Sequence, residues 1–304
     1  MEYSHVSVLL AETVEALNLK AGDVVVDSTL GGGGHAMAVY KRVQPTGKLV
    51  GIDRDISAIQ NFPATDRVQL AHANYCEIDR VLDEFGVDKV DAIVADLGLS
   101  SHQIDTAERG FSYMNDAPLD MRMNASEDAK TAYDVVNTMS EKVLANLIYE
   151  LGDERYSRQI AANIVRSRPI KTTGELSQIC VESVPVSYFK FFGHPAKKTF
   201  QAIRMLVNRE LESLEKFLEF APQRLKVGGR IAIITFHSGE DRLVKHEFKR
   251  MATDCLCPPK SPKCICGHKA TMRLVTKKPI TPGREELKAN PRSASAKLRV
   301  AEKI

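Results

Sequence analysis

The sequence lacks any long hydrophobic run. No apolar stretch in its 304 residues approaches the roughly 20 residues that a membrane-spanning helix needs. The amino terminus, Met1-Glu-Tyr-Ser-His5, has neither the basic nor the apolar region of a secretory signal peptide. Internal repeats and low-complexity tracts are also absent. We therefore expect a globular cytoplasmic protein with no membrane partner.

Cysteine is scarce, and most of it is concentrated in one loop. Of six cysteines, Cys255, Cys257, Cys264 and Cys266 form two C-x-C pairs in a proline-bearing segment. Four thiolates in a short loop can hold a tetrahedral zinc ion, although C-x-C is less common than a spacing of two to four residues. A disulfide framework is disfavoured in a reducing cytosol. Free thiols in a packed loop are the favoured interpretation, and no metal ligand is assigned from the sequence.

The net charge of +3 conceals an uneven distribution of basic residues. Residues 260–304 contain twelve Lys or Arg against three Glu, and residues 155–209 contain ten against two. Such segments are candidate phosphate-contacting surfaces, with ordinary solvated surface charge as the alternative.

Short apolar strands alternate with helical patterns in the first hundred residues, which predicts a parallel sheet with crossover helices. The pattern turns helical from about Thr131 to Asn208, and strands then return. The expected strands are Val24–Val26, Leu49–Ile52, Val68–Ala71, Ala92–Ala95, Arg230–Phe236, Arg273–Thr276 and Lys297–Ala301. We predict an α/β domain from residues 1–109 and 207–304, split by a helical insertion over residues 110–206.

A glycine-rich turn follows the first expected strand, in the segment Asp27-Ser-Thr-Leu-Gly-Gly-Gly-Gly-His35. A strand, a glycine turn and a helix meet in this way where Rossmann-like domains bind nucleotide cofactors. Glycines let the backbone approach a ligand, and the helix start offers unpaired N–H groups. Asp27 would repel a pyrophosphate but suits the ammonium group of S-adenosylmethionine. The turn therefore favours a methyl donor over a dinucleotide.

Side chains at the ends of the next strands complete a candidate donor site. Asp53 follows the second strand where Rossmann-like sheets hold ribose hydroxyls, with helix capping as the alternative, and Asp55 is the candidate cap. Tyr75 could stack on an adenine or could be a half-buried core tyrosine.

The candidate catalytic residues are Asp96, Ser100 and His237. Asp96 ends the fourth strand and opens the hydroxyl-rich loop Asp96-Leu-Gly-Leu-Ser-Ser101, at the crevice where a reacting group would meet the methyl group. We interpret His237 as a positioning residue rather than a general base. Ser238, with Asp241 three residues on, predicts the cap of the following helix.

The motifs, taken together, resemble one family over almost the entire chain: the 16S ribosomal RNA cytosine-N4 methyltransferases of the MraW group. The matching segments are His5-Val-Ser-Val-Leu-Leu, Asp27–His35, Asp96–Ser101, Arg109-Gly-Phe-Ser112, His194-Pro-Ala-Lys-Lys-Thr-Phe-Gln201, Thr235-Phe-His-Ser238, Glu240-Asp-Arg242 and Asn290–Arg299. Two departures are Gly239, where the family has leucine, and Ala117, where it has glycine. Neither removes a titratable group.

The resemblance implies a class I methyltransferase fold that uses S-adenosylmethionine to methylate the N4 amine of a cytidine in the decoding region of 16S rRNA, in the small ribosomal subunit. It implies donor contacts from Gly33, Gly34, His35, Asp53, Tyr75, Asp96 and Gln103. Our candidates for holding rRNA phosphates are Lys197, Lys198, Arg204, Arg292 and Arg299. The sequence leaves open whether the chain forms a homodimer and whether naked RNA or an assembled subunit is the substrate.

The target amine is a poor nucleophile because its lone pair is delocalised into the ring. We expect Asp96 and the carbonyls of residues 97–99 to accept hydrogen bonds from it and to aim it at the methyl group. The target base must be unstacked to reach the crevice. Three rivals are a small-molecule methyltransferase, a dinucleotide-dependent oxidoreductase, and a non-catalytic RNA-binding protein on the same scaffold.

Overall fold

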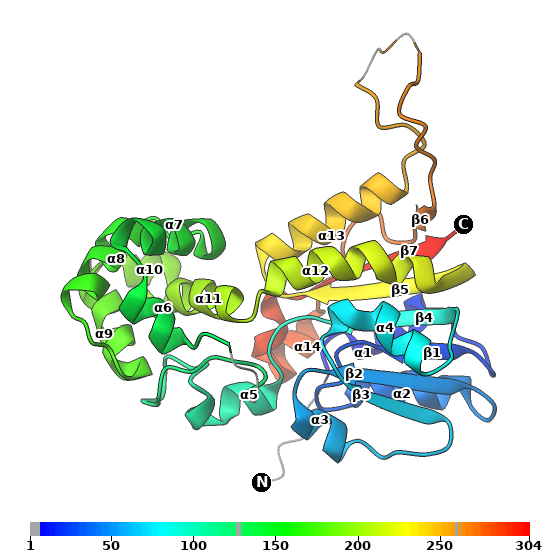
Figure 1. The fold of residues 1–304 in the computed structure, drawn as a ribbon, viewed down its shortest axis with the longest axis horizontal. Coiled ribbons are helices and arrows are strands. Elements are labelled where there is room, and N and C mark those ends of the chain that lie inside the picture. The colour runs from blue at the N-terminus through cyan, green and yellow to red at the C-terminus, as the bar shows by residue number, and fades with distance from the viewer. Residues whose placement is uncertain (1–6, 126–128, 259–260, 262) are drawn as a thin grey trace. The chain divides into compact units, whose positions relative to one another are not determined.

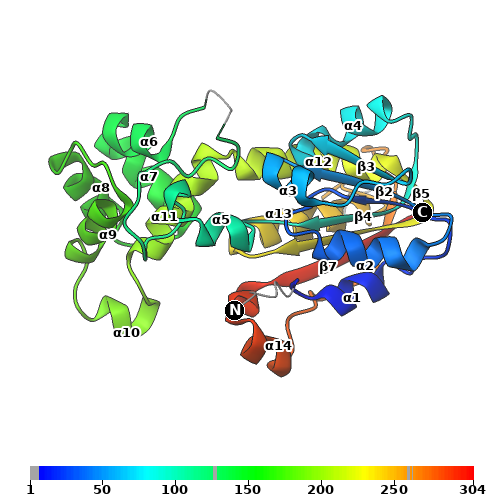
Figure 2. The same cartoon turned by 90° about the horizontal axis from the view of Figure 1, so that it is seen from below.

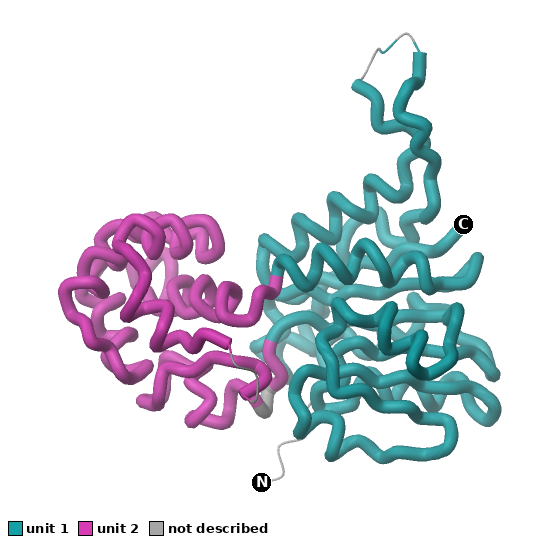
Figure 3. The backbone as a smooth tube through the Cα atoms, viewed as in Figure 1, with its two compact units in different colours: residues 1–98, 211–304 teal, residues 99–210 magenta. Residues whose placement is uncertain are grey.

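A computed structural model describes residues 7–125, 129–258, 261 and 263–304. The chain divides into two compact units, one from residues 1–98 with 211–304 and the other from residues 99–210 (Figure 3). Each unit encloses its own buried core. No helix in the described part of the chain is both long and apolar enough to cross a membrane.

The first unit is built on a seven-stranded sheet of order β3-β2-β1-β4-β5-β7-β6 (Figure 1). Strands β1 to β5 pair in parallel, whereas β7 runs antiparallel to both β5 and β6. The strands are β1 (Val24–Asp27), β2 (Lys48–Asp53), β3 (Val68–His72), β4 (Val90–Asp96), β5 (Leu225–Thr235), β6 (Met272–Leu274) and β7 (Lys297–Lys303). All seven overlap the predicted strands, although β5 begins at Leu225 instead of the expected Arg230, and β6 spans Met272–Leu274 instead of Arg273–Thr276. The expected Rossmann-like fold is confirmed.

Helices cover both faces of this sheet (Figure 2). The helical elements of the first unit are α1 (Leu10–Ala16), α2 (Gly34–Val43), α3 (Ile56–Asn61), η1 (Tyr75–Glu77), α4 (Ile78–Glu84), α12 (Glu210–Phe220, whose first residue falls in the second unit), η3 (Ala221–Arg224), α13 (Ser238–Met251), α14 (Arg284–Ala289) and η4 (Pro291–Ser295). Because side chains alternate along a strand, Val26 packs with α4, α12 and α13 on one face, and Val25 packs with α2 on the other. Burial on both faces explains why the central strands are nearly continuous apolar runs.

The second unit is helical in all its described elements. These are α5 (Ser101–Asp105), η2 (Ala107–Arg109), α6 (Ala132–Thr138), α7 (Glu141–Gly152), α8 (Ser157–Arg166), α9 (Thr173–Glu182), α10 (Tyr188–Phe192) and α11 (Ala196–Val207). The predicted helical periodicity is confirmed in α7, where Leu144 and Ile148 are fully buried and Leu147 packs beside them. The helical insertion is thus a folded unit with a core of its own.

The ends of this unit differ from the expected limits of residues 110–206. The carbonyl of Arg109 accepts a hydrogen bond from the Met121 N–H at 3.0 Å, and the Arg109 guanidinium donates to the carbonyl of Met123 at 2.7 Å. At the other end, the Asn208 side chain bonds to the backbone of Met121 and Met123, each at 2.8 Å. These contacts tie residues on either side of the expected limits to the helical core, which periodicity alone does not reveal.

The second unit also buries a carboxylate whose hydrogen bonds contribute to its stability. Glu154 is 0% exposed and accepts hydrogen bonds from the Tyr188 hydroxyl and from the Tyr156 N–H. Tyr188→Phe removes one donor, so we expect the free energy of unfolding in urea to fall by about 1–3 kcal/mol. Tyr149→Phe is the matched control because that side chain is 60% exposed. Equal stability of the two variants would contradict this role for the Tyr188 hydroxyl.

Candidate active site

Three carboxylates lie at one edge of the sheet, at the carboxyl ends of neighbouring strands. Asp27 ends β1, Asp53 ends β2 and Asp96 ends β4, and β1 lies between the other two. In the register, Asp27 is paired with Gly51 of β2 and Val94 of β4. This is the edge where open α/β sheets bind their ligands.

The turn after β1 is fixed by hydrogen bonds to the neighbouring strands. Ser28 donates to the carbonyl of Val94 through its N–H at 2.9 Å and through its hydroxyl at 2.6 Å. Gly33 caps α2 with φ at 76°, in the left-handed region that favours glycine, and provides no side-chain hydrogen bond to the helix. The first N–H groups of α2 therefore have no side-chain cap, as at a helix start that binds a ligand.

Packing explains part of the glycine run. A Cβ atom on Gly33 would lie 2.6 Å from the Phe62 ring, and one on Gly34 would lie 1.9 Å from the Ser7 hydroxyl. At these two positions the absence of a side chain serves the protein's own core as well as the approach of a ligand.

Asp53 supports the glycine turn from β2. Its two oxygens accept hydrogen bonds from the N–H groups of Gly31 and Asp55, each at 2.7 Å. Burial raises the pKa of this carboxyl above its ordinary value. The predicted cap at Asp55 is confirmed, because its side chain accepts from the N–H of Ser57 at the start of α3.

Asp27 and Asp96 are deficient in hydrogen bonds. Among the described residues, Asp27 Oδ2 and Asp96 Oδ1 are buried and have no hydrogen-bond partner. Burial raises the pKa of Asp27 to about 7, with a smaller contribution from the charge of Asp53. Burial also raises the pKa of Asp96 well above its ordinary value, and repulsion from Asp27 and Glu240 adds to the effect. Such a site favours a ligand that brings positive charge and hydrogen-bond donors.

His35, in the first turn of α2, lies between Asp96 and the amino-terminal segment. Its Nε2 is 3.0 Å from the carbonyl of Val8, and its Nδ1 is 3.5 Å from Asp96 Oδ2. The ring is buried and lies next to the Asp96 carboxyl group. The amino-terminal motif that begins at His5 lies partly outside the described residues.

Tyr75 begins η1, three residues after the end of β3. Its ring meets that of Phe217 edge-on, with centroids 5.3 Å apart, at the margin of the core. Asn74 fixes the turn by accepting from the Cys76 N–H and by donating to the Ser213 hydroxyl, each at 3.1 Å. Both predicted roles, core packing and stacking on a base, are compatible with this half-buried ring.

The start of α13 differs from the prediction that Ser238 and Asp241 form the cap. The helix begins at Ser238, so the cap is His237, whose Nδ1 accepts from the Glu240 N–H at 3.4 Å. Glu240 accepts in return from the N–H groups of Phe236 and His237. Asp241 instead pairs with Arg299 at 2.7 Å. The prediction was wrong because it placed the helix start one residue too late. The positioning role of His237 stays a prediction.

Ser100 and Gln103 belong to the second unit. The Ser100 hydroxyl accepts from the Gln103 N–H, and the Gln103 side chain accepts from the Ser100 N–H, each at 3.2 Å. This reciprocal pair caps α5. Catalysis by Ser100 and donor binding by Gln103 stay predictions.

The five candidate phosphate ligands fall into two groups. Arg299 is 7% exposed and pairs with Asp241, and Arg204 forms a two-pronged ion pair with Glu210 at 2.8 and 2.9 Å. Both guanidinium groups are thus engaged by carboxylates of the protein, which argues against phosphate contacts there. Lys197 and Arg292 are exposed, and Lys198 is half-buried. Charge counting could not separate the groups, because it carries no information on burial.

Charge counting also missed a surface on α10 that combines aromatic rings with cations. Phe189, Phe191 and Phe192 are 43%, 69% and 41% exposed. Lys190 lies 5.7 Å from the Phe191 ring centroid, and Lys198 lies 5.6 Å from that of Phe192. We call these five residues the α10 surface. The sequence signal was the interleaved run Tyr188-Phe-Lys-Phe-Phe192, which resembles the aromatic and basic platforms that bind single-stranded nucleic acid.

Comparison with known proteins places the chain in a family. The MraW methylase family matches residues 2–304. The "Ribosomal RNA small subunit methyltransferase H" of Clostridium botulinum strain Kyoto is 50% identical over 311 residues, covering 100% of both chains. The proteins of the same name from Lachnospira eligens and Clostridioides difficile are 48% and 47% identical, covering 100% of this chain and 99% and 100% of theirs. The chain therefore belongs to the MraW methylase family.

Proposed function

We propose that this protein is an S-adenosylmethionine-dependent methyltransferase that modifies the N4 amine of a cytidine in the decoding region of 16S rRNA, in the small ribosomal subunit. The observation that carries the proposal is the pair of buried, unpartnered oxygens on Asp27 and Asp96 at the carboxyl edge of the sheet. Full-length relatives named for methylation of small-subunit rRNA support the substrate class.

The donor site fits a cationic ligand. Asp27 lies beside the glycine turn, and its unpartnered oxygen suits the ammonium group of the donor's methionine part. Asp53 accepts backbone hydrogen bonds that shape the turn, and its remaining lone pairs suit ribose hydroxyls. A dinucleotide would instead place its pyrophosphate next to a carboxylate. These contacts favour a methyl donor, which supplies an electrophilic methyl group on a sulfonium.

The acceptor site requires a group that orients a weakly nucleophilic amine. The unpartnered Asp96 Oδ1 can accept a hydrogen bond from the exocyclic amine. The Asp96 N–H donates to the Thr29 hydroxyl at 2.6 Å, which anchors the backbone that carries this carboxyl group, and His35 Nδ1 lies 3.5 Å from its other oxygen. A bound cationic donor lowers the pKa of Asp96 and keeps it ionised. Catalysis then rests on positioning and electrostatics, and no covalent intermediate is required.

The α10 surface supports a nucleic-acid substrate. Its exposed rings offer stacking faces for unpaired bases, while Lys190 and Lys198 provide positive charge for phosphates. Exposed Lys197, from the neighbouring α11, adds to this charge. A small-molecule methyltransferase has no need of such a surface.

The reaction is tested with isotopically labelled S-adenosylmethionine and small ribosomal subunits from a strain that lacks the enzyme. We expect mass spectrometry to locate the label in N4-methylcytidine of 16S rRNA. Asp96→Asn should lower the single-turnover rate by about 100-fold or more even when the donor is saturating, so that a loss of donor affinity does not account for the effect. Label in another nucleoside would refute the N4 assignment. An unchanged single-turnover rate in the variant would refute the role of Asp96.

The contacts with RNA are tested by the salt dependence of binding. Lys197→Ala and Lys198→Ala should each weaken RNA binding. Each should also make the negative slope of log binding constant against log salt concentration shallower by about one. Arg299→Ala breaks the buried ion pair with Asp241, so it should instead lower the free energy of unfolding by about 3 kcal/mol. The folded part of the Arg299→Ala protein should bind RNA with the same salt slope as the wild type. A salt slope that the two lysine variants leave unaltered would contradict the proposed surface.

A further inference from the structure

The described residues between α13 and β6, which are 252–258, 261 and 263–271, take no part in the proposed chemistry. Figure 1 shows this part of the chain as an excursion beyond the end of α13. Its base is closed by two hydrogen bonds, from the Thr271 N–H to the Met251 carbonyl at 2.8 Å and between His268 Nε2 and the Arg250 carbonyl at 2.9 Å. The excursion contains the two C-x-C pairs.

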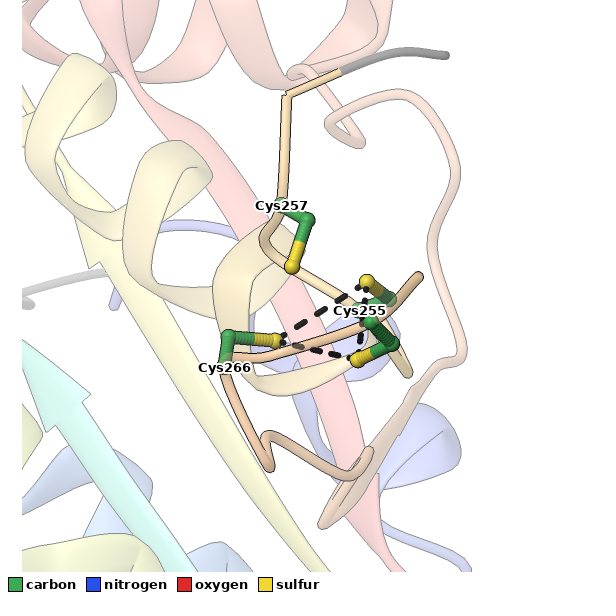
Figure 4. A group of neighbouring side chains, drawn as sticks. Cys255, Cys257 and Cys266 are labelled. Carbon is green, nitrogen blue, oxygen red and sulfur yellow. Dashed lines mark hydrogen bonds between the residues drawn. The ribbon is translucent and has the colours of Figure 1, made fainter. Parts of the chain in front are cut away.

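The four cysteine sulfurs converge on one point. Cys255 Sγ lies 3.5 Å from Cys264 Sγ and 3.8 Å from Cys266 Sγ, and the last two are 3.7 Å apart. All four sulfurs, including that of Cys257, lie within 4.8 Å of one another (Figure 4). A tetrahedral ion with metal–sulfur bonds of about 2.3 Å places its ligands about 3.8 Å apart. The observed spacing is therefore that of a tetrathiolate metal centre, and it is far longer than the roughly 2.0 Å of a disulfide bond.

Backbone hydrogen bonds to the sulfurs link the two C-x-C turns to each other. The N–H of Leu256, between the first two cysteines, donates to Cys266 Sγ at 3.3 Å. The N–H of Ile265, between the other two, donates to Cys257 Sγ at 3.4 Å. Each C-x-C turn thus donates to a sulfur of the other. Such bonds stabilise thiolates, and partners of this kind orient the ligands of a metal.

Hydrophobic packing does not explain the convergence. Leu256 is 47% exposed and Ile265 is 89% exposed, so the apolar side chains of both turns face solvent while the four sulfurs lie close to one another. Cys255, Cys264 and Cys266 are themselves exposed. The loop is not packed as the sequence interpretation of free thiols expected. A segment without a core needs another source of order, and a bound metal ion supplies it.

We propose that Cys255, Cys257, Cys264 and Cys266 bind one Zn²⁺ ion as a structural tetrathiolate centre that fixes the two described stretches around it, 252–258 and 263–271. On binding, four S–H groups release their protons to solvent and four sulfur–zinc bonds form, with no change in oxidation state. Four protein ligands leave no open coordination position, so the centre is structural rather than catalytic. Lys263 and Lys269, in the same segment, offset part of the negative charge of the centre.

The proposal is tested by metal analysis of the full-length protein, purified anaerobically with a thiol reductant. We expect about one zinc per chain, and cobalt substitution should give the absorption bands of a tetrahedral tetrathiolate. Cys255→Ser and Cys266→Ser should each weaken zinc binding by at least about 100-fold. Cys76→Ser is the matched control, since Cys76 lies outside the cluster, and it should retain the metal.

Limited trypsin digestion gives a second readout that does not depend on activity. Chelation of the metal, or Cys266→Ser, should speed cleavage at Lys263 and Lys269, while binding of S-adenosylmethionine by the Rossmann-like unit is retained. Retained donor binding shows that the variant is folded. Absence of stoichiometric zinc or cobalt binding, zinc retained by both serine variants, an iron–sulfur absorption spectrum, or disulfides in the anaerobic protein would each overturn the proposal. None of these results bears on the methyltransferase assignment.

Discussion

The architecture of the site depends on the burial of carboxylates that lack sufficient partners. Asp27 and Asp96 each hold an oxygen away from solvent with no hydrogen bond among the described residues, and burial raises the pKa of both groups. In the absence of a ligand this arrangement is unfavourable, because a buried carboxylate without partners pays an uncompensated desolvation penalty. A cation with N–H or O–H donors removes that penalty. The two buried carboxyl groups therefore make the site selective for positively charged ligands, independently of the fit of the ligand's shape.

Sheet topology is what brings these groups together. The order β2-β1-β4 places three strand ends side by side. Gly51, which the register pairs with Asp27, gives room to Leu30 of the glycine turn, because a Cβ atom on Gly51 would lie 3.1 Å from the Leu30 side chain. The second unit interrupts the chain directly after β4, the strand that ends in Asp96. An insertion at this point of the sequence enlarges the connection from β4 to β5 without altering the sheet.

Much of this was predictable from the sequence, and what was not depends on burial or on single-residue register. The seven strands are predictable from apolar runs bounded by turns. That the acidic residues at three strand ends lie at the same edge of the sheet is predictable from the parallel topology. The prediction made Ser238 the cap of α13, whereas the structure makes it the first helical residue. His, Ser and Glu side chains can each take part in a cap, and only the backbone dihedral angles show which residue precedes the helix. Arg299 and Arg204 were proposed as phosphate ligands because charge counting cannot identify a buried ion pair. The convergence of the four thiols likewise required coordinates, since C-x-C spacing alone is ambiguous.

The most direct test of the account is the affinity for S-adenosylmethionine as a function of pH, measured by calorimetry from about pH 5.5 to about pH 8.5. With its pKa raised to about 7, Asp27 is protonated below that pH in the free protein, and a cationic donor prefers the ionised form. Affinity should therefore be full above about pH 7 and should fall by up to about tenfold per pH unit below it, with Asp96 acting in the same direction.

Asp27→Asn should bind at least about tenfold more weakly at high pH and lose most of this slope. Asp23→Asn, at the opposite end of β1, should match the wild type. A pH-independent affinity in the wild type, or unchanged binding by Asp27→Asn, would contradict the central role of the buried carboxylates.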